Sequence, residues 1–372
     1  MLASYRNDLK PIAELAQSFA ARELAGKTGE HDRYPFGEFY DQVLLKAHEA
    51  GFLCAILPES LGGLGGGLGG DIGGDIGALC EILIHICETD ASPGGIIFTQ
   101  ALSQKLLLAA GAWNLTQTFP PEAASASASA KDLLIAYPVY TNPAQTDSLP
   151  LAQKTGSDYN LTGRLELLVL GNLARQAIIP ARCGIGPSYS FFLVDLDDQN
   201  VKKSEPVFTL GLHACPAVDV TFSHAPARLI GEENAGRQYF EKVSPEMNAA
   251  AAAMNAGILR GVYNEAVAYS QNREQGGRPI INWSEIGMML SSIFVKADVA
   301  AMCVCQSCLE LEQKKSGYET RVSAAALHIA ELSCDATSDG IQILGGYGYM
   351  KDYGQEKRYR DARMVQALLG AV

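Results

Sequence analysis

Positive charge is scarce in this chain. Its 372 residues include 29 lysines and arginines against 41 aspartates and glutamates, which gives a formal net charge of −12. Nucleic-acid binding depends on lysine and arginine neutralising phosphates, so we expect no nucleic-acid partner. Charged residues of both signs make up only 19% of the chain and apolar residues 48%. This balance predicts that some helix faces are buried between subunits.

Long apolar runs are lacking as well. No uninterrupted hydrophobic stretch reaches the roughly 18 residues that cross a bilayer. At the start of the chain, Arg6, Asp8 and Lys10 interrupt the segment where a signal peptide would need its apolar core. We therefore expect a cytoplasmic protein without a membrane span.

The cysteines and histidines do not show the spacing of a metal site. The nine cysteines are scattered among apolar neighbours, which is typical of reduced, buried thiols. Cys303, Cys305 and Cys308 lie close together, but their alanine- and valine-rich surroundings favour a helix, which turns the first two about 200° apart. The six histidines show no ligand spacing either. We therefore expect no metal site.

The hydrophobic pattern divides the chain into three parts. Helical periodicity covers residues 1–131, short β-like runs separated by turn residues cover 132–231, and helical periodicity returns in 232–372. This order predicts an α+β fold with a helical N-terminal domain, a central β-barrel or sandwich, and a C-terminal helical bundle.

Individual residues suggest where elements begin and end. Gly51 closes a helix, and Ser244 followed by Pro245 predicts the start of a long one. The glycine-rich run from 62 to 77 follows no clear strand and lacks the Gly-Lys-Ser/Thr ending of a phosphate-binding loop, so we expect a mobile loop. The alanine- and serine-rich stretch from 113 to 131 predicts a connector between domains.

The most specific motif lies near the end of the chain. Residues 339–363 read Asp-Gly-Ile-Gln-Ile-Leu-Gly-Gly-Tyr-Gly-Tyr-Met-Lys-Asp-Tyr-Gly-Gln-Glu-Lys-Arg-Tyr-Arg-Asp-Ala-Arg, which closely resembles the C-terminal signature of the acyl-CoA dehydrogenases. Three earlier segments resemble other family motifs in the same order, at 58–65, 229–236 and 272–280. The resemblance covers nearly the whole chain. It implies the family fold, with a four-helix bundle as the last domain.

The resemblance also implies a cofactor and the residues that bind it. In this family an FAD lies between the β-domain and the bundle and is held partly by the neighbouring subunit. Arg273 would face the pyrophosphate with Gln275 beside it, while Gln342, Gly345 and Gly346 would form a second wall. The alternative for Arg273 is a solvated charge at a helix end. The alternative for the two glycines is a helix C-cap followed by a turn, but the joint spacing of the motifs favours the FAD-related interpretation.

The catalytic base of the family is missing from its usual places. Counting without gaps from the signature puts that base at Leu369, which cannot accept a proton. Some relatives carry the base at a position that aligns with Met247, and the adjacent family arginine is Asn248 here. Glu246 lies one residue off, so on a helix it points about 100° away. We expect it to complement the dipole of the first helical turn. The catalytic residues therefore stay unknown.

The surroundings of the flavin ring depart from the family pattern too. Where the family shows Lys-x-Trp-Ile-Thr-Asn, residues 165–170 read Leu-Glu-Leu-Leu-Val-Leu. The family's glycine-rich loop is unrecognisable between Pro138 and Ser148, and the aromatic residue of the Gln-Phe-Gly motif is Gly276. We expect that the chain does not build a complete active site from its own residues.

Three interpretations follow. The preferred one is a subunit of a hetero-oligomeric acyl-CoA dehydrogenase, a dimer or tetramer, in which a homologous partner carries the base and this chain contributes the Arg273 and Gln342 side of a shared FAD site. The second is a non-catalytic acyl-CoA-binding or scaffold protein of the same fold. The third is an active homo-oligomer that uses Glu246 or an unaligned acid. By resemblance the substrate is an acyl-CoA, and electrons pass to an electron-transferring flavoprotein.

Overall fold

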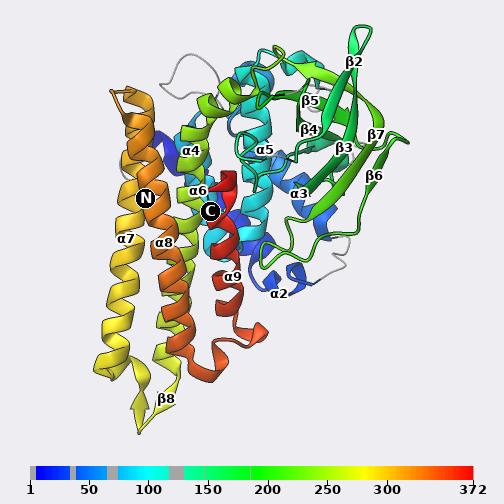
Figure 1. The fold of residues 1–372 in the computed structure, drawn as a ribbon. Coiled ribbons are helices and arrows are strands. Elements are labelled where there is room, and N and C mark those ends of the chain that lie inside the picture. The colour runs from blue at the N-terminus through cyan, green and yellow to red at the C-terminus, as the bar shows by residue number, and fades with distance from the viewer. Residues whose placement is uncertain are drawn as a thin grey trace.

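A computed structural model describes residues 6–33, 39–64, 74–116, 130–146, 148–184 and 186–371. Its helices and strands follow the predicted order of helices, sheet and helices (Figure 1). The N-terminal helices are α1 (Lys10–Phe19), α2 (Thr28–His31), α3 (Phe39–Glu49), α4 (Ile76–Thr89) and α5 (Ala91–Ala109). The α+β fold predicted from the sequence is therefore confirmed.

The apolar block before residue 110 forms two helices. Asp90 breaks it, because its side chain accepts a hydrogen bond from Ser92 N at 3.0 Å and so caps α5. Gly51 follows α3 with φ of 79°, as its predicted role as a helix end requires. Much of the glycine-rich run, residues 65–73, and of the connector, residues 117–129, lies outside the described residues.

The central domain is one curled sheet. Its strands are β1 (Ile135–Ala136), β2 (Leu151–Thr155), β3 (Asp158–Val169), β4 (Gln176–Ala181), β5 (Ser190–Asp195), β6 (Val201–Lys203) and β7 (Ala217–Ile230). The order is β1-β4-β5-β7-β3-β2, with β6 pairing with β7. Bridges from Tyr137 to Val169 and from Leu151 to Arg182 join strands that are far apart in this order. The sheet therefore curls into the barrel-like form that the sequence predicted.

The C-terminal bundle consists of α6 (Gly236–Asn272), α7 (Ser284–Gln313), α8 (Tyr318–Leu344) and α9 (Gln355–Gln366). The predicted start of α6 is wrong: the helix begins at Gly236, so Pro245 lies inside it. Ser244 does not cap the helix, because its hydroxyl donates to Phe240 O one turn back at 2.7 Å. The helix continues through Pro245, although a proline inside a helix removes one ladder hydrogen bond and crowds the preceding turn.

Helix α7 is long and apolar enough to cross a membrane by length and composition, although 39% of its most apolar window is buried inside the protein. It packs against α6 and α8 along the bundle (Figure 1). Lys296 on α7 pairs with Asp339 on α8 at 3.0 Å. One face of α7 therefore belongs to the bundle core, while the other leaves apolar side chains exposed.

Candidate functional site

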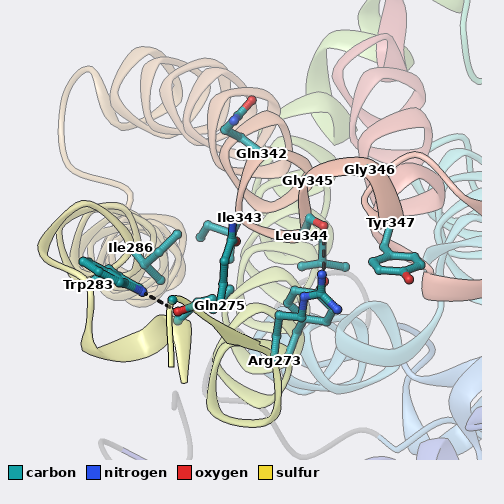
Figure 2. Close-up of a pocket in the computed structure, with 13 residues that line it drawn as sticks. Arg273, Gln275, Trp283, Ile286, Gln342, Ile343, Leu344, Gly345, Gly346 and Tyr347 are labelled. Carbon is teal, nitrogen blue, oxygen red and sulfur yellow. Dashed lines mark hydrogen bonds between the residues drawn. The ribbon is translucent and has the colours of Figure 1, made fainter. Parts of the chain in front are cut away.

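A pocket of about 880 Å³ lies at one end of the bundle, where α6 ends, α7 begins and α8 ends. All five residues predicted to bind a cofactor line it: Arg273, Gln275, Gln342, Gly345 and Gly346. We call it the clamp pocket. The structure thus brings together residues from two segments that are far apart in the sequence (Figure 2). Their role in binding a cofactor stays a prediction.

The end of α6 positions Arg273. The residue is the C-cap of the helix and turns into an extended conformation, while its N–H still donates to Tyr269 O at 2.9 Å. The chain then forms a small hairpin of β8 (Glu274–Gln275) and β9 (Arg278–Pro279). Ile280 N donates to Arg273 O at 2.8 Å and closes the base of the hairpin. This places Arg273 and Gln275 at the pocket.

The end of α8 forms the opposite wall. Gly345 caps the helix with φ of 59° and ψ of −132°, a conformation that glycine adopts without strain. A Cβ built on Gly345 or Gly346 would meet nothing within 4 Å, so both expose bare backbone to open space. The sequence left two alternatives for these glycines, a helix cap and a wall of the site. In the structure they follow the end of α8 and also line the pocket. In Figure 2 the Gln342 side chain points away from Arg273.

Among the described residues that line the clamp pocket, Arg273 is the one with a charged side chain. Its guanidinium lies 5.6 Å from the centre of the Tyr347 ring, and among the described residues no carboxylate forms an ion pair with it. The pocket thus combines a guanidinium that has no acidic partner in the described residues with exposed glycine backbone and aromatic rings. These groups suit a ligand that contains both phosphates and flat rings. The lining therefore fits the diphosphate side of a dinucleotide such as FAD.

A second cleft, of about 330 Å³, lies where the start of α6, α8 and the end of the chain meet. Its polar side chains are amides and hydroxyls: Asn142, Gln145, Ser244, Asn248, Asn255, Ser323 and Gln366. We call it the neutral cleft, because none of the described residues that line it is ionisable. The Oδ1 atom of Asn255 is buried in the protein without a hydrogen-bond partner in the described part of the chain.

Leu369, at the position where the family carries its base, lines the neutral cleft. It is 7% exposed, and its N–H donates to Val139 O at 2.6 Å, which ties the chain end to the β-domain. Met247 is fully buried, while Asn248 donates to the Ser323 hydroxyl at 3.0 Å. The residues at both expected base positions are therefore present in the fold but cannot take up a proton.

Glu246 has a different role from the one predicted. It lies well inside α6, so it does not complement a first helical turn. Its carboxylate pairs with Lys105 of α5, with Nζ to Oε2 at 2.5 Å, and it does not line the neutral cleft. Since Lys105 is only 6% exposed, the carboxylate serves to compensate a buried charge. The sequence could not show this partner, which lies on another helix.

The strand that would face a flavin ring offers little hydrogen bonding. Leu165 and Val169 of β3 are buried in the hydrophobic core, and the pairing of β3 with β7 shifts register between Leu165 and Leu168. Leu167 lies in this bulge with φ of 54°. The loop before β2 contributes Asn142 and Gln145 to the neutral cleft.

Buried ion pairs hold α9 and the chain end in place. Lys357 Nζ contacts Asp90 at 2.7 Å and Asp361 at 2.6 Å. Burial alone would lower the pKa of Lys357, but these two carboxylates raise it. Burial raises the pKa of Asp361, although it also accepts from Leu212 N at 2.7 Å. These charges fix α9 against α5 and the β-domain, so they are structural.

A second charged group joins three segments around Asp32. Its carboxylate contacts His213 Nδ1 at 2.9 Å and Arg360 Nη2 at 2.7 Å. Burial opposes its ionisation, but the hydrogen bonds from His213 and Arg360 outweigh burial and hold the pKa of Asp32 well below its usual range. The hydrogen bond to Asp32 in turn raises the pKa of His213. This group lines neither the clamp pocket nor the neutral cleft.

Among the described residues, no group of three or more histidine, cysteine or acidic side chains is arranged to hold a metal ion. Cys303, Cys305 and Cys308 all lie on α7, and the last two are buried. The sequence did not single out the aromatic and apolar residues that line the clamp pocket: Tyr269, Ile280, Trp283, Ile286, Ile343, Leu344 and Tyr347. For Trp283, the sequence did contain a signal. It is an aromatic residue shortly after the segment that resembles the Gln-Phe-Gly motif, in which Gly276 replaces the family's phenylalanine.

Comparison with known proteins agrees with this picture. The family model "Acyl-CoA dehydrogenase, N-terminal domain" matches residues 7–127, and "Acyl-CoA dehydrogenase, C-terminal domain" matches residues 234–371. The caffeyl-CoA reductase-Etf complex subunit CarC of Acetobacterium woodii is 26% identical over 365 residues, covering 95% of this chain and 92% of the relative. Cyclohexane-1-carbonyl-CoA dehydrogenase of Geobacter metallireducens is 26% identical over 372 residues, covering 98% and 94%.

Solved structures show the same fold. An acyl-CoA dehydrogenase from Geobacillus kaustophilus superposes with a TM-score of 0.82 at 20% identity, covering 97% of this chain and 93% of that one. Two family models that together match most of the chain, full-length relatives and the shared fold lead to one conclusion. The chain belongs to the acyl-CoA dehydrogenase family.

Proposed function

We propose that this chain is a subunit of a hetero-oligomeric, FAD-dependent enzyme that dehydrogenates or reduces a CoA thioester. A homologous partner carries the catalytic base and the contacts to the flavin ring, and this chain supplies the clamp pocket. The observation that carries the proposal is the contrast between the two cavities. The clamp pocket keeps its arginine and its open glycines, whereas the neutral cleft contains no ionisable side chain among its described residues.

The geometry of α6 supports a clamp that serves another subunit. Asn248 lies in the neutral cleft and Arg273 at the clamp pocket. At 1.5 Å per residue, the helix between them extends for about 37 Å. One dinucleotide does not span that length. A cofactor held by Arg273 therefore places its reactive ring against a neighbouring chain.

An exposed seam on α7 supports assembly with such a neighbour. Apolar residues recur along its outer face at intervals of seven, four, three and seven residues. They are Met288, Val295, Val299, Met302 and Leu309, and all are exposed. This is the spacing by which helices of different chains pack against each other. Together with the shared cofactor site, it favours an oligomer over a monomer.

The relatives extend the proposal to an electron partner. CarC is, by its name, a subunit of a reductase-Etf complex. We propose that the complex containing this chain likewise exchanges electrons with an electron-transferring flavoprotein. The direction of the reaction, dehydrogenation or reduction, then depends on the potential of that partner.

In this mechanism the residues of this chain bind and orient. FAD, when bound, would supply hydride transfer at the β-carbon of the thioester. Arg273 would hold its diphosphate, and the backbone of Gly345 and Gly346 would allow the diphosphate to approach closely. Tyr347, next to Arg273, keeps the guanidinium at the pocket. Proton removal from the α-carbon is left to a carboxylate of the partner, since Leu369 cannot perform it.

Co-expression tests the proposal. The chain is produced alone and together with dehydrogenase-like chains encoded beside it, and flavin absorbance is recorded before and after adding an acyl-CoA. We expect the chain alone to be free of flavin and the complex to hold flavin that bleaches with substrate. A chain that purifies alone with bound flavin bleached by an acyl-CoA would instead be an active homo-oligomer.

A second candidate function rests on the neutral cleft. The cleft remains hollow, and the unpaired Oδ1 of Asn255 offers an acceptor to an amide N–H such as those of a pantetheine arm. The chain would then bind an acyl-CoA without reacting. Calorimetry on the chain alone distinguishes the two: acyl-CoA binding that Asn255→Ala abolishes, without flavin or partner, favours the binding protein.

A further inference from the structure

The neutral cleft closes at Asn255. Along the face of α6 that lines the cleft, Ser244 and Asn248 are partly exposed, whereas Asn255 is 1% exposed. The wall formed by α8 shows the same change, from the exposed Leu327 to the buried Ala330. The cleft therefore has an outer end that opens to solvent and an inner end at Asn255.

One hydrogen bond sets the orientation of the Asn255 amide. Its Nδ2 atom donates to Ala251 O, one turn back along α6, at 3.3 Å. A backbone carbonyl can only accept a hydrogen bond, so the amide nitrogen faces Ala251 and the amide oxygen is turned the other way. That oxygen is buried, and nothing in the described part of the chain donates to it. The nearby amide of Asn248, by contrast, donates to the Ser323 hydroxyl at 3.0 Å.

An unpaired oxygen at the inner end of the cleft determines which ligand fits there. A buried carbonyl oxygen without a donor is destabilising, because it has lost its hydrogen bonds to water and gained none in the protein. A ligand that brings an O–H or N–H to this oxygen restores the hydrogen bond, whereas a hydrocarbon leaves it unpaired. No described residue that lines the cleft carries a charge to balance an ionised ligand group. The inner end therefore suits an uncharged hydrogen-bond donor.

The direction of the cleft indicates which part of an acyl-CoA reaches Asn255. The nucleotide end of CoA carries phosphates, which are costly to bury without cations, so it stays at the outer end. The acyl group then points toward the closed end. The buried apolar residues of the lining, among them Ala330, Val365 and Leu368, suit the hydrocarbon part of that group. At about 330 Å³ the cleft is at the lower end of the roughly 300–1,000 Å³ range of small-molecule pockets, so it fits an acyl group better than a whole CoA.

We infer that Asn255 is a specificity-determining residue, and that the neutral cleft selects acyl-CoA thioesters whose acyl group carries a hydroxyl or another uncharged donor near its end. The inference rests on the second candidate function, acyl-CoA binding in this cleft, and names the class of acyl group. It does not depend on the heteromeric proposal, because every contact comes from this chain. The other donors in such a ligand are the pantetheine amides, and the experiment separates the two sources.

Matched pairs of ligands test the inference on the chain alone. Isothermal titration calorimetry compares an ω-hydroxyacyl-CoA with the thioester that carries a methyl group in place of the hydroxyl. Butanoyl, hexanoyl and octanoyl chains are used, so that the series covers different depths of the cleft. For the chain that reaches Asn255, the hydroxylated ligand should bind about 10-fold more tightly, because a buried acceptor regains its donor. Free CoA carries the pantetheine amides without an acyl group and should bind more weakly than either.

Substitutions assign this preference to one side chain. Asn255→Leu replaces the amide with an apolar group of similar size, so it should weaken the hydroxylated ligand about 10-fold and leave the methyl ligand as tight or tighter. Asn248→Ala is the matched control, because it changes an amide of the same cleft that is already paired with Ser323. It should leave the ratio of the two affinities unchanged. Circular dichroism shows whether each variant folds.

Each contrary result has its own meaning. Equal affinity of the wild type for both members of every pair would overturn the inference and leave acyl-CoA binding in place. If Asn255→Leu weakened both ligands and free CoA by the same factor, the donor would belong to the pantetheine arm and the inference would be wrong. No binding of any acyl-CoA would overturn the second candidate function as well. If Asn255→Leu does not fold, the wild-type pairs and Asn255→Ala decide the question.

Discussion

The clamp pocket and the neutral cleft lie at opposite ends of α6, and among the described residues that line them only the clamp pocket has a charged side chain. The clamp pocket keeps a cation without an acidic partner in the described residues. In the neutral cleft, the carboxylate nearest in sequence, that of Glu246, compensates Lys105 instead. Both places therefore keep the fold, while a charged side chain without an acidic partner is kept in one of them among the described residues. The following predictions test this difference, beginning with the largest effect.

The buried charges that fix α9 should affect folding and not catalysis. Lys357→Met leaves the buried carboxylates of Asp90 and Asp361 without their cation. Breaking a buried pair in this way costs about 3–5 kcal/mol of unfolding free energy, measurable by urea denaturation. The matched control, Lys242→Met, changes an exposed lysine of α6 and should stay within about 0.5 kcal/mol. Equal stability of the two variants would contradict a structural role for Lys357.

Arg273 should matter only for cofactor binding. In the purified complex, Arg273→Ala removes a charge-assisted contact worth about 1.5–3 kcal/mol, so flavin affinity should fall about 10- to 100-fold, measured by equilibrium dialysis. Leu369→Ala, which alters the neutral cleft, should leave flavin affinity unchanged. The exposed Arg237→Ala controls for loss of a surface charge. A larger loss of flavin for Leu369→Ala than for Arg273→Ala would reverse the assignment of the two cavities.

Glu246 should matter only for stability. Glu246→Gln leaves Lys105 without its carboxylate and should cost about 1–2 kcal/mol of unfolding free energy, since Glu246 is partly exposed. Flavin reduction by the complex should stay the same, as followed in a stopped-flow experiment with acyl-CoA. The control, Glu241→Gln, breaks an exposed pair on the same helix and should have little effect. Loss of flavin reduction in the Glu246 variant would identify it as the base.

The smallest effect is expected around Asp32. His213 has a raised pKa in the folded protein, so its stabilising contribution is present below the ordinary histidine pKa of about 6.5 and is lost as pH rises through the folded value. His213→Gln should therefore destabilise the protein by up to about 1 kcal/mol at about pH 6 and less at about pH 9. Denaturation midpoints at both pH values measure this.

The His328→Gln variant controls for the pH series, because His328 is exposed on α8. It keeps His213 and should therefore match the wild type at each of the two pH values. Because Asp32 has a lowered pKa, its own contribution is present above about pH 3.9 and is lost as pH falls. A His213 variant that changed flavin binding in the complex would link this group to a pocket that it does not line.

The sequence singled out five residues that the structure places in one pocket, but it did not reveal their surroundings. Arg273 and Gly345 lie at helix ends within recognisable motifs, so local sequence identified them. Trp283 was missed because its ring replaces one lost in the preceding turn. The pairing of Glu246 with Lys105 was missed because the partner lies on α5. The start of α6 was misplaced because Ser244 and Pro245 form a common helix-start pattern, and tertiary packing overrides such local signals.

The number of flavins per chain tests the central claim most directly. In a one-to-one complex of this chain with a homologous dehydrogenase subunit, each clamp pocket of this chain completes the partner's site, while the neutral cleft completes none. The account predicts half as many bound flavins as chains, measured by flavin absorbance against the mass of the purified complex. One flavin for every chain would contradict it.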